Sequence, residues 1–168
     1  LDNEEEPAVL SSACIALGHH DDGRAVPYLQ KLADHSEAEV RTAAASGLLW
    51  RQEEGAITTL EKLSRDDNGE VRSWATFGLA EHVDSSLSPE EHQDDPLTEA
   101  LLERLGDPFD DAREEAIIGL ARRKDERVLF PLLIELSSHR VGTLAVEAAA
   151  EMATPVLYGP LWQLAWWW

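Results

Sequence analysis

A unit of about 30 residues recurs along the chain, and this repetition constrains the fold more than any other feature. Its clearest copy, residues 66–79, has an aspartate in a turn, then a Val-Arg pair, then small and apolar residues at helical spacing. Residues 34–48 and 107–120 repeat the pattern. Aligned on one small residue, the copies share a register with separations of 31, 31, 41 and 32 residues, at Ala13, Ala44, Ala75, Ala116 and Ala148. The sequence therefore predicts a repeat array.

Each copy predicts two helices joined by a short polar turn. Residues 24–33 carry apolar side chains at helical spacing, and after the turn so do residues 37–50. We predict an all-α fold, an α-solenoid wound as a right-handed superhelix of about five helix-turn-helix repeats, in one domain over residues 1–168. The first helices should form the convex layer and the second helices the concave layer.

The ends of the chain and its lone cysteine carry further expectations. Residues 156–168 predict the first helix of a partial sixth repeat, ending on Trp166-Trp167-Trp168. We expect this triplet to cap the array or to be covered by a further repeat, rather than to bind a ligand. A single Cys14 excludes an internal disulfide and favours a reducing compartment, so we expect a cytoplasmic protein. No run of residues is long and apolar enough to cross a membrane.

The chain is strongly acidic, with a net charge of -19. Between Glu81 and Asp111 there are eleven acidic residues and one basic residue, Arg104. This segment includes the irregular spacing in the array, so we predict an acidic loop insertion at residues 82–96. Such a field repels polyanions, which argues against nucleic-acid binding and favours a protein partner with a basic surface. The alternative is that the acids only keep the array soluble.

The pattern resembles HEAT repeats, including the bacterial HEAT-like class associated with phycobilin lyase subunits. That family has a proline in the first helix, an aspartate in the turn and Val-Arg at the start of the second helix. Here Pro27 stands 14 positions before Arg41, and Asp66 and Asp107 stand six before Arg72 and Arg113. Residues 66–136 are also similar to a bacterial HEAT group that includes an immunity protein encoded beside a Rhs-type toxin. The resemblance implies a helical scaffold, and it implies either toxin neutralisation or bilin attachment.

The repeated arginines and aspartates are interpreted first as scaffold. A guanidinium at the start of each second helix can bond to the turn aspartate and carbonyls of its neighbour, which makes a ladder between repeats. The expected ladder comprises Asp66, Asp107, Arg41, Arg72 and Arg113.

Other positions on the second helices vary in size and charge, as a partner-specific surface would. They lie one residue before, two after and six after the aligned alanine, so they share one helical face. We predict a partner-binding surface of Trp50, Trp74, Phe77, Glu81, Glu115, Ile118 and Arg122. The alternative is that Trp74 and Phe77 only fill a gap between repeats.

The motifs for chemistry are weak. The chain has no glycine-rich phosphate loop, no nucleophile elbow and no paired cysteines, and His19-His20-Asp21-Asp22 fixes no metal geometry. We therefore expect no catalytic residues, no metal and no cofactor. The favoured function is a non-catalytic scaffold that binds a protein on its concave face, for example as a toxin-neutralising immunity protein. The alternatives are a bilin lyase or chaperone-like subunit and a structural segment of a longer array. The sequence does not indicate an oligomeric state.

Overall fold

The computed structural model describes residues 6–20, 22–83, 88, 91–92 and 95–167, and within them it contains helices and turns but no strand. The chain divides into two compact units, Leu1–His82 and Val83–Trp168, and each is described by itself. Much of the acidic insertion predicted at residues 82–96 lies outside the described residues. The prediction of one domain over residues 1–168 stays a prediction.

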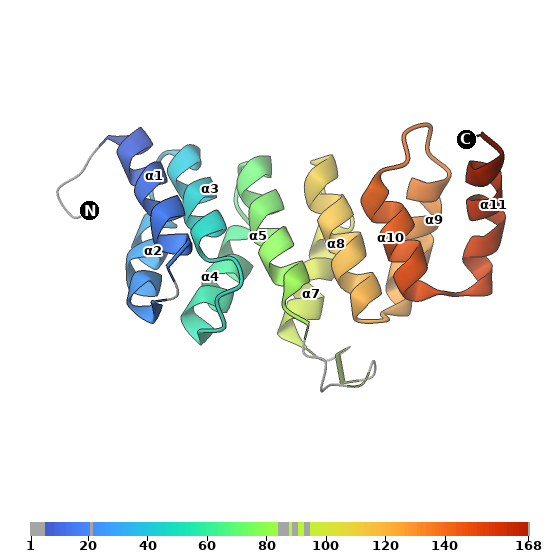
Figure 1. The fold of residues 1–168 in the computed structure, drawn as a ribbon, viewed down its shortest axis with the longest axis horizontal. Coiled ribbons are helices and arrows are strands. Elements are labelled where there is room, and N and C mark those ends of the chain that lie inside the picture. The colour runs from blue at the N-terminus through green and yellow to red at the C-terminus, as the bar shows by residue number, and fades with distance from the viewer. Residues whose placement is uncertain (1–5, 21, 84–87, 89–90, 93–94, 168) are drawn as a thin grey trace. The chain divides into compact units, whose positions relative to one another are not determined.

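The first unit stacks helices in two layers (Figure 1). The second helices of the repeats, α1 (Pro7–Gly18), α3 (Ala38–Gly47) and α5 (Gly69–Glu81), lie side by side. The first helices, α2 (Val26–Leu32) and α4 (Glu54–Leu63), pack behind them, and a 3-10 turn η1 (Gly23–Ala25) leads into α2. Between the layers lies an apolar core that includes Leu29, Leu48, Leu60 and Leu79, each fully buried. Burying a leucine side chain contributes about 1.5–3 kcal/mol, so this core is the main source of the unit's stability.

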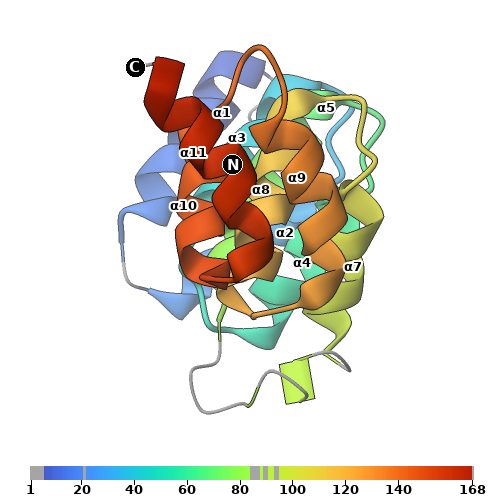
Figure 2. The same cartoon turned by 90° about the vertical axis from the view of Figure 1, so that its right-hand side faces the viewer.

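The second unit has the same construction. Its first helices are α7 (Pro96–Arg104), α9 (Leu129–Leu136) and α11 (Tyr158–Trp167), and its second helices are α8 (Asp110–Arg122) and α10 (Thr143–Met152). The 3-10 turns η2 (Glu126–Val128) and η3 (Pro155–Leu157) lead into α9 and α11. Figure 2 shows α7 and α9 on one side of α8 and α10. The helix bounds agree with the predicted helical segments to within a few residues.

Two of the described α-helices, α5 and α7, begin at a side-chain cap. Asn68 accepts hydrogen bonds from the backbone N–H groups of Glu70 (2.9 Å) and Val71 (3.2 Å), two donors that the first turn of α5 would otherwise leave unpaired. Asp95 caps α7 in the same way through Leu97 N (3.1 Å), and Pro96 occupies the first helical position. These local signals explain why the turn chemistry located the helices well.

In the first unit, α1 and α3 approach each other closely. A side chain at Gly47 would meet the carbonyl oxygen of Cys14 at 2.7 Å, and one at Gly18 would meet the Cα of Gly47 at 2.8 Å, so both positions require glycine. Cys14 is fully buried in this contact, and burial raises the pKa of its thiol to about 11. The predicted alignment placed Ala13 at this register, but Ala13 is only half-buried while Leu10 and Cys14 are buried. The first repeat is therefore shifted by one residue from the prediction.

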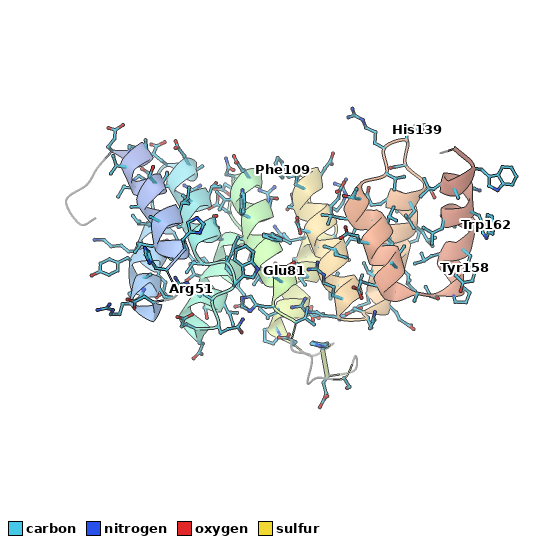
Figure 3. The ribbon with its side chains drawn as sticks, viewed as in Figure 1. Arg51, Glu81, Phe109, His139, Tyr158 and Trp162 are labelled. Atoms are coloured by element: carbon cyan, nitrogen blue, oxygen red, sulfur yellow. The ribbon has the colours of Figure 1, made fainter. Side chains whose placement is uncertain are left out.

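The last helix leaves an apolar side uncovered. Tyr158, Trp162 and Trp166 follow one another at intervals of four residues along α11 and are 57%, 66% and 83% exposed. In Figure 3, Tyr158 and Trp162 project from α11 away from α9 and α10. This exposure contradicts capping by Trp166, whereas the other expectation, that a further repeat covers the terminal tryptophans, stays a prediction.

Candidate functional site

Three aromatic rings gather on the second-helix side of the first unit. The ring of Phe77 on α5 meets Trp50 at a centroid distance of 6.2 Å and Trp74 at 6.2 Å, and both pairs are edge-to-face, with interplanar angles of 87° and 78°. Trp50 is 66% exposed and Trp74 38%, while Phe77 is half-buried. We call these three residues the aromatic cluster. Phe77 holds both indoles in place while most of the Trp50 ring faces solvent.

Trp50 has an unusual backbone. Its φ is +58°, in the left-handed region that bulky side chains rarely adopt. The sequence predicted that α3 would continue to Trp50, but α3 ends at Gly47 and the chain turns over residues 48–50. Trp50 therefore approaches Phe77 from the connector rather than from a helical face. The left-handed conformation costs about 1–2 kcal/mol for most residues, and packing recovers little of it because the indole is so exposed.

Arg51, which the sequence analysis missed, fixes this connector. The residue is only 4% exposed, and its guanidinium Nη2 donates to the carbonyl oxygens of Leu17, at 3.0 Å, and His20. These carbonyls end α1, where helical partners are absent, so the bonds tie the connector of one repeat to the preceding second helix. Figure 3 shows Arg51 beside that end of α1. Sequence alone could not separate Arg51 from a solvent-exposed arginine, since its role depends on the turn at Trp50.

An acidic residue follows the cluster along α5. Trp74, Phe77 and Glu81 lie at spacings of three and four, which places them on one helical face. Glu81 is half-buried, and Figure 3 shows it on α5. Glu70, one turn before Trp74, is exposed. The aromatic cluster thus has a carboxylate at each end along α5.

The predicted surface residues of the second unit behave differently. Glu115 and Arg122 on α8 are half-buried. Ile118 between them is 1% exposed, so its inclusion in the partner-binding surface was wrong. Its position in the row follows helical spacing, but its side chain packs in the interior. The second unit presents charged groups and no aromatic cluster at these positions.

The repeated arginines lie at the starts of the second helices. Arg41 forms a bidentate pair with Asp66 of the next repeat, with Nε–Oδ2 2.7 Å and Nη2–Oδ1 2.8 Å. Its Nη1 also donates to the carbonyl oxygens of His35 and Ser36, each at 2.9 Å. Arg41 therefore joins two repeats through Asp66, as the ladder hypothesis expects, but the carbonyls that it binds belong to its own turn rather than to the neighbouring one.

Arg72 and Arg113 close their own turns in the same way. Arg72 donates to the carbonyls of Asp66 (2.9 Å) and Asp67 (3.1 Å), and Arg113 to that of Asp107 (2.9 Å). Arg113 also bonds to Glu135 Oε1 on α9 at 2.7 Å, where the following turn offers no aspartate. Asp107 is buried and accepts from Phe109 N at 2.9 Å, which closes the turn that leads into α8.

The surroundings of two carboxyl groups, Asp66 and Glu114, shift their pKa values in opposite directions. Burial alone would raise the pKa of Asp66, but hydrogen bonds from Arg41 and Asn68 N outweigh it and lower the pKa below its usual value. For Glu114 on α8, burial and the nearby charges of Glu135 and Asp111 raise the pKa. Neither group lies beside the aromatic cluster in sequence, and both belong to the scaffold contacts of their own unit.

The described residues contain no group of three or more His, Cys, Asp or Glu side chains placed to hold a metal ion. Among the described helices, none has the length and apolarity to span a bilayer.

Comparison with known proteins supports the fold. The family described as HEAT repeats matches residues 1–80. Protein YibA of Escherichia coli K12 is 41% identical over 61 residues, which are 36% of this chain and 22% of that protein, and YibA of Escherichia coli O157:H7 matches equally. The aligned segment thus spans about a fifth of the length of these relatives.

A solved structure extends the similarity in shape. The X-ray structure of Escherichia coli YibA matches with a TM-score of 0.57 and 23% sequence identity, over 98% of this chain and 72% of that chain. At this identity the match concerns the fold alone. Together with the all-helical structure of the described residues, it confirms the predicted fold class, an α-solenoid of HEAT-like helical pairs.

Proposed function

We propose that this chain is a non-catalytic protein-binding module and that the aromatic cluster is the centre of its binding surface. The observation that carries the proposal is the exposure of Trp50 together with its left-handed backbone. Strain of this kind persists where the surrounding structure holds it, and it is common at functional sites. A helical-repeat fold supplies a rigid support for such a surface.

The composition of the surface supports protein binding. Tryptophan is enriched among residues that dominate binding energy, and large rigid rings lose little conformational entropy when they are covered. The partner should carry a basic surface, since the chain has a net charge of -19 and opposite charge speeds the encounter. A toxin-neutralising role is the specific form of the proposal that the resemblance to an immunity protein suggests.

The proposal is tested by co-purification with the product of the neighbouring gene. The wild-type chain should retain that protein, whereas the double variant Trp74→Ala/Glu81→Lys should lose it. Trp162→Ala is the matched control, because Trp162 is as exposed as Trp50 but lies on α11. Thermal melting of each variant checks that the fold is kept.

Two results would count against the proposal. Retention of the partner by the double variant would show that the surface lies elsewhere. Loss of the partner with Trp162→Ala alone would move the surface to α11. For the toxin-neutralising form, growth of cells that express the neighbouring gene should depend on the wild-type chain and fail with the double variant.

A further inference from the structure

The aromatic cluster has a chemistry that protein binding in general does not explain. Two of its three rings are indoles, whose faces attract cations more strongly than those of phenylalanine or tyrosine. Trp74 and Phe77 of the cluster lie on α5 between Glu70 and Glu81, and residues 1–82 contain sixteen acidic residues against seven basic ones. An apolar partner group here would desolvate carboxylates without compensation, whereas a cation would meet both rings and negative charge.

The rings are arranged before any partner arrives. Phe77 contacts each indole edge-to-face, and Arg51 fixes the connector that carries Trp50 through its bonds to the end of α1. A prearranged site loses less entropy on binding than a flexible one. The backbone strain at Trp50 is then understandable, because the left-handed turn places an indole against Phe77 that a helical residue would not place there.

On this basis, and resting on the proposed function, we propose that the aromatic cluster binds the guanidinium group of an arginine on the protein partner. A planar guanidinium stacks on an indole face and is more weakly hydrated than a lysine ammonium. Its N–H groups also bond to carboxylates, and Glu81 follows Phe77 by one turn on the same face of α5. Arginine is therefore favoured over lysine, and both are favoured over an apolar side chain.

Another exposed aromatic stripe, on α11, shows what the cluster adds. Tyr158, Trp162 and Trp166 expose as much ring surface, but α11 contains no charged residue. The stripe offers rings without flanking carboxylates. It therefore serves as an internal comparison for the role of charge.

The test uses the whole 168-residue chain and four acetylated peptides in which a single arginine, lysine, citrulline or leucine is flanked by glycine and serine. Citrulline has nearly the shape of arginine but no charge. Binding is followed by NMR through the indole N–H signals. We expect the arginine peptide to shift the signals of Trp50 and Trp74 and to leave that of Trp162 unchanged. Citrulline should weaken binding about tenfold, the effect of losing cation–π contacts worth about 1–2 kcal/mol.

Variants keep the result interpretable. Trp50→Asn and Trp74→Ala leave the net charge unchanged, so a loss of binding in either one reports ring contact rather than attraction to an acidic protein. Trp162→Ala should bind the arginine peptide like the wild type. Trp50→Asn also suits the left-handed backbone, so its fold should be kept.

The inference is overturned if citrulline binds as well as arginine, if leucine binds more tightly, or if Trp162 responds as strongly as Trp50. Its failure is distinguishable from failure of the proposed function. If a partner is retained through Trp74 but substitution of its arginines has no effect, protein binding stands and arginine recognition falls. If the arginine peptide binds the cluster but the variant Trp74→Ala/Glu81→Lys still retains the partner, arginine binding by the cluster stands, and the proposal that the partner binds there fails.

Discussion

The connector after α3 and the connector after α8 share a backbone conformation but make different contacts. Trp50 and Lys124 both have φ of +58°, and each directs its side chain to the second helix of the next repeat in its unit. The ammonium group of Lys124 donates to the backbone carbonyl oxygen of Glu151 and to the Oε2 atom of the same residue, with Nζ–Oε2 3.1 Å. Trp50 instead contacts the ring of Phe77. A left-handed residue at this point thus bridges two repeats, and its side chain decides what the bridge can do.

The difference separates scaffold from surface. In the second unit the ammonium group of Lys124 is used by its own chain, and the contact links repeats. In the first unit the Phe77 contact holds one side of the indole, and 66% of Trp50 stays exposed for a partner. The same left-handed conformation therefore supports a contact between repeats in one unit and the proposed binding site in the other.

The largest effect should come from removing the ion pair that joins two repeats of the first unit. Arg41→Ala deletes the bidentate pair with Asp66 and two bonds to carbonyls, in a place where the side chains are 17% and 11% exposed. We expect the free energy of unfolding to fall by about 2–4 kcal/mol, measured by urea denaturation. Arg24→Ala is the control, because its side chain is 89% exposed and should matter little. An equal loss of stability in both variants would contradict the stabilising role of the Arg41–Asp66 pair.

The second prediction isolates the backbone of the two connectors. Trp50→Asn and Trp50→Ala both remove the indole, but asparagine tolerates the left-handed conformation better. The asparagine variant should be more stable by roughly 1 kcal/mol. Lys124→Asn and Lys124→Ala should differ by the same amount in thermal or urea unfolding if the two connectors are equivalent. No difference in either pair would mean that neither backbone is strained.

The third prediction concerns the ion pair that distinguishes the connectors. Lys124 and Glu151 are 46% and 45% exposed, so Lys124→Ala should lower the free energy of unfolding by about 0.5 kcal/mol or less. The difference between wild type and variant should shrink in 1 M salt. The effect of Trp50→Ala should not depend on salt. A salt-independent loss for Lys124 would point to packing of its aliphatic chain instead.

The smallest effect is expected from a crowded carboxylate. The pKa of Glu114 is raised in the folded chain, so its charged form opposes folding at neutral pH, and this penalty disappears once the pH falls below its unfolded value of about 4.3. Glu114→Gln should therefore raise stability slightly at pH 7 and leave it unchanged at low pH. Urea unfolding at several pH values measures both.

Asp66 provides the opposite case in the first unit. Its lowered pKa means that it contributes stability above its unfolded pKa, about 3.9, and loses that contribution as the pH falls through the folded value. Asp66→Asn should thus destabilise the chain at pH 7 and flatten its acid unfolding. If both variants changed stability in the same direction, the contrast between the two carboxyl groups would be wrong.

The sequence predicted most of the fold because its signals are local and periodic. Asn68, Asp95 and Pro7 mark helix starts by the chemistry of a single turn. The register failed in the first repeat, where Cys14 rather than Ala13 fills the interior. Small residues adjacent in sequence give no periodic signal that chooses between them, and the choice depends on the close approach of Gly47.

The candidate site was predicted less completely. Variation between repeats identified Trp74 and Phe77, but helical spacing also selected Ile118, which is buried. Trp50 was expected on a helix. Its contact with Phe77 depends on a left-handed backbone conformation, which a tryptophan in the sequence does not predict. Arg51 was missed because its partners are backbone carbonyls of Leu17 and His20, which carry no sequence signature.

The buried thiol of Cys14 offers a kinetic consequence. It is the chain's single cysteine, it lies between α1 and α3, and the thiolate that reacts with labelling reagents is suppressed at neutral pH. A reagent can modify it only when α1 detaches. The labelling rate of Cys14 therefore measures how often α1 detaches from α3, separately from global unfolding.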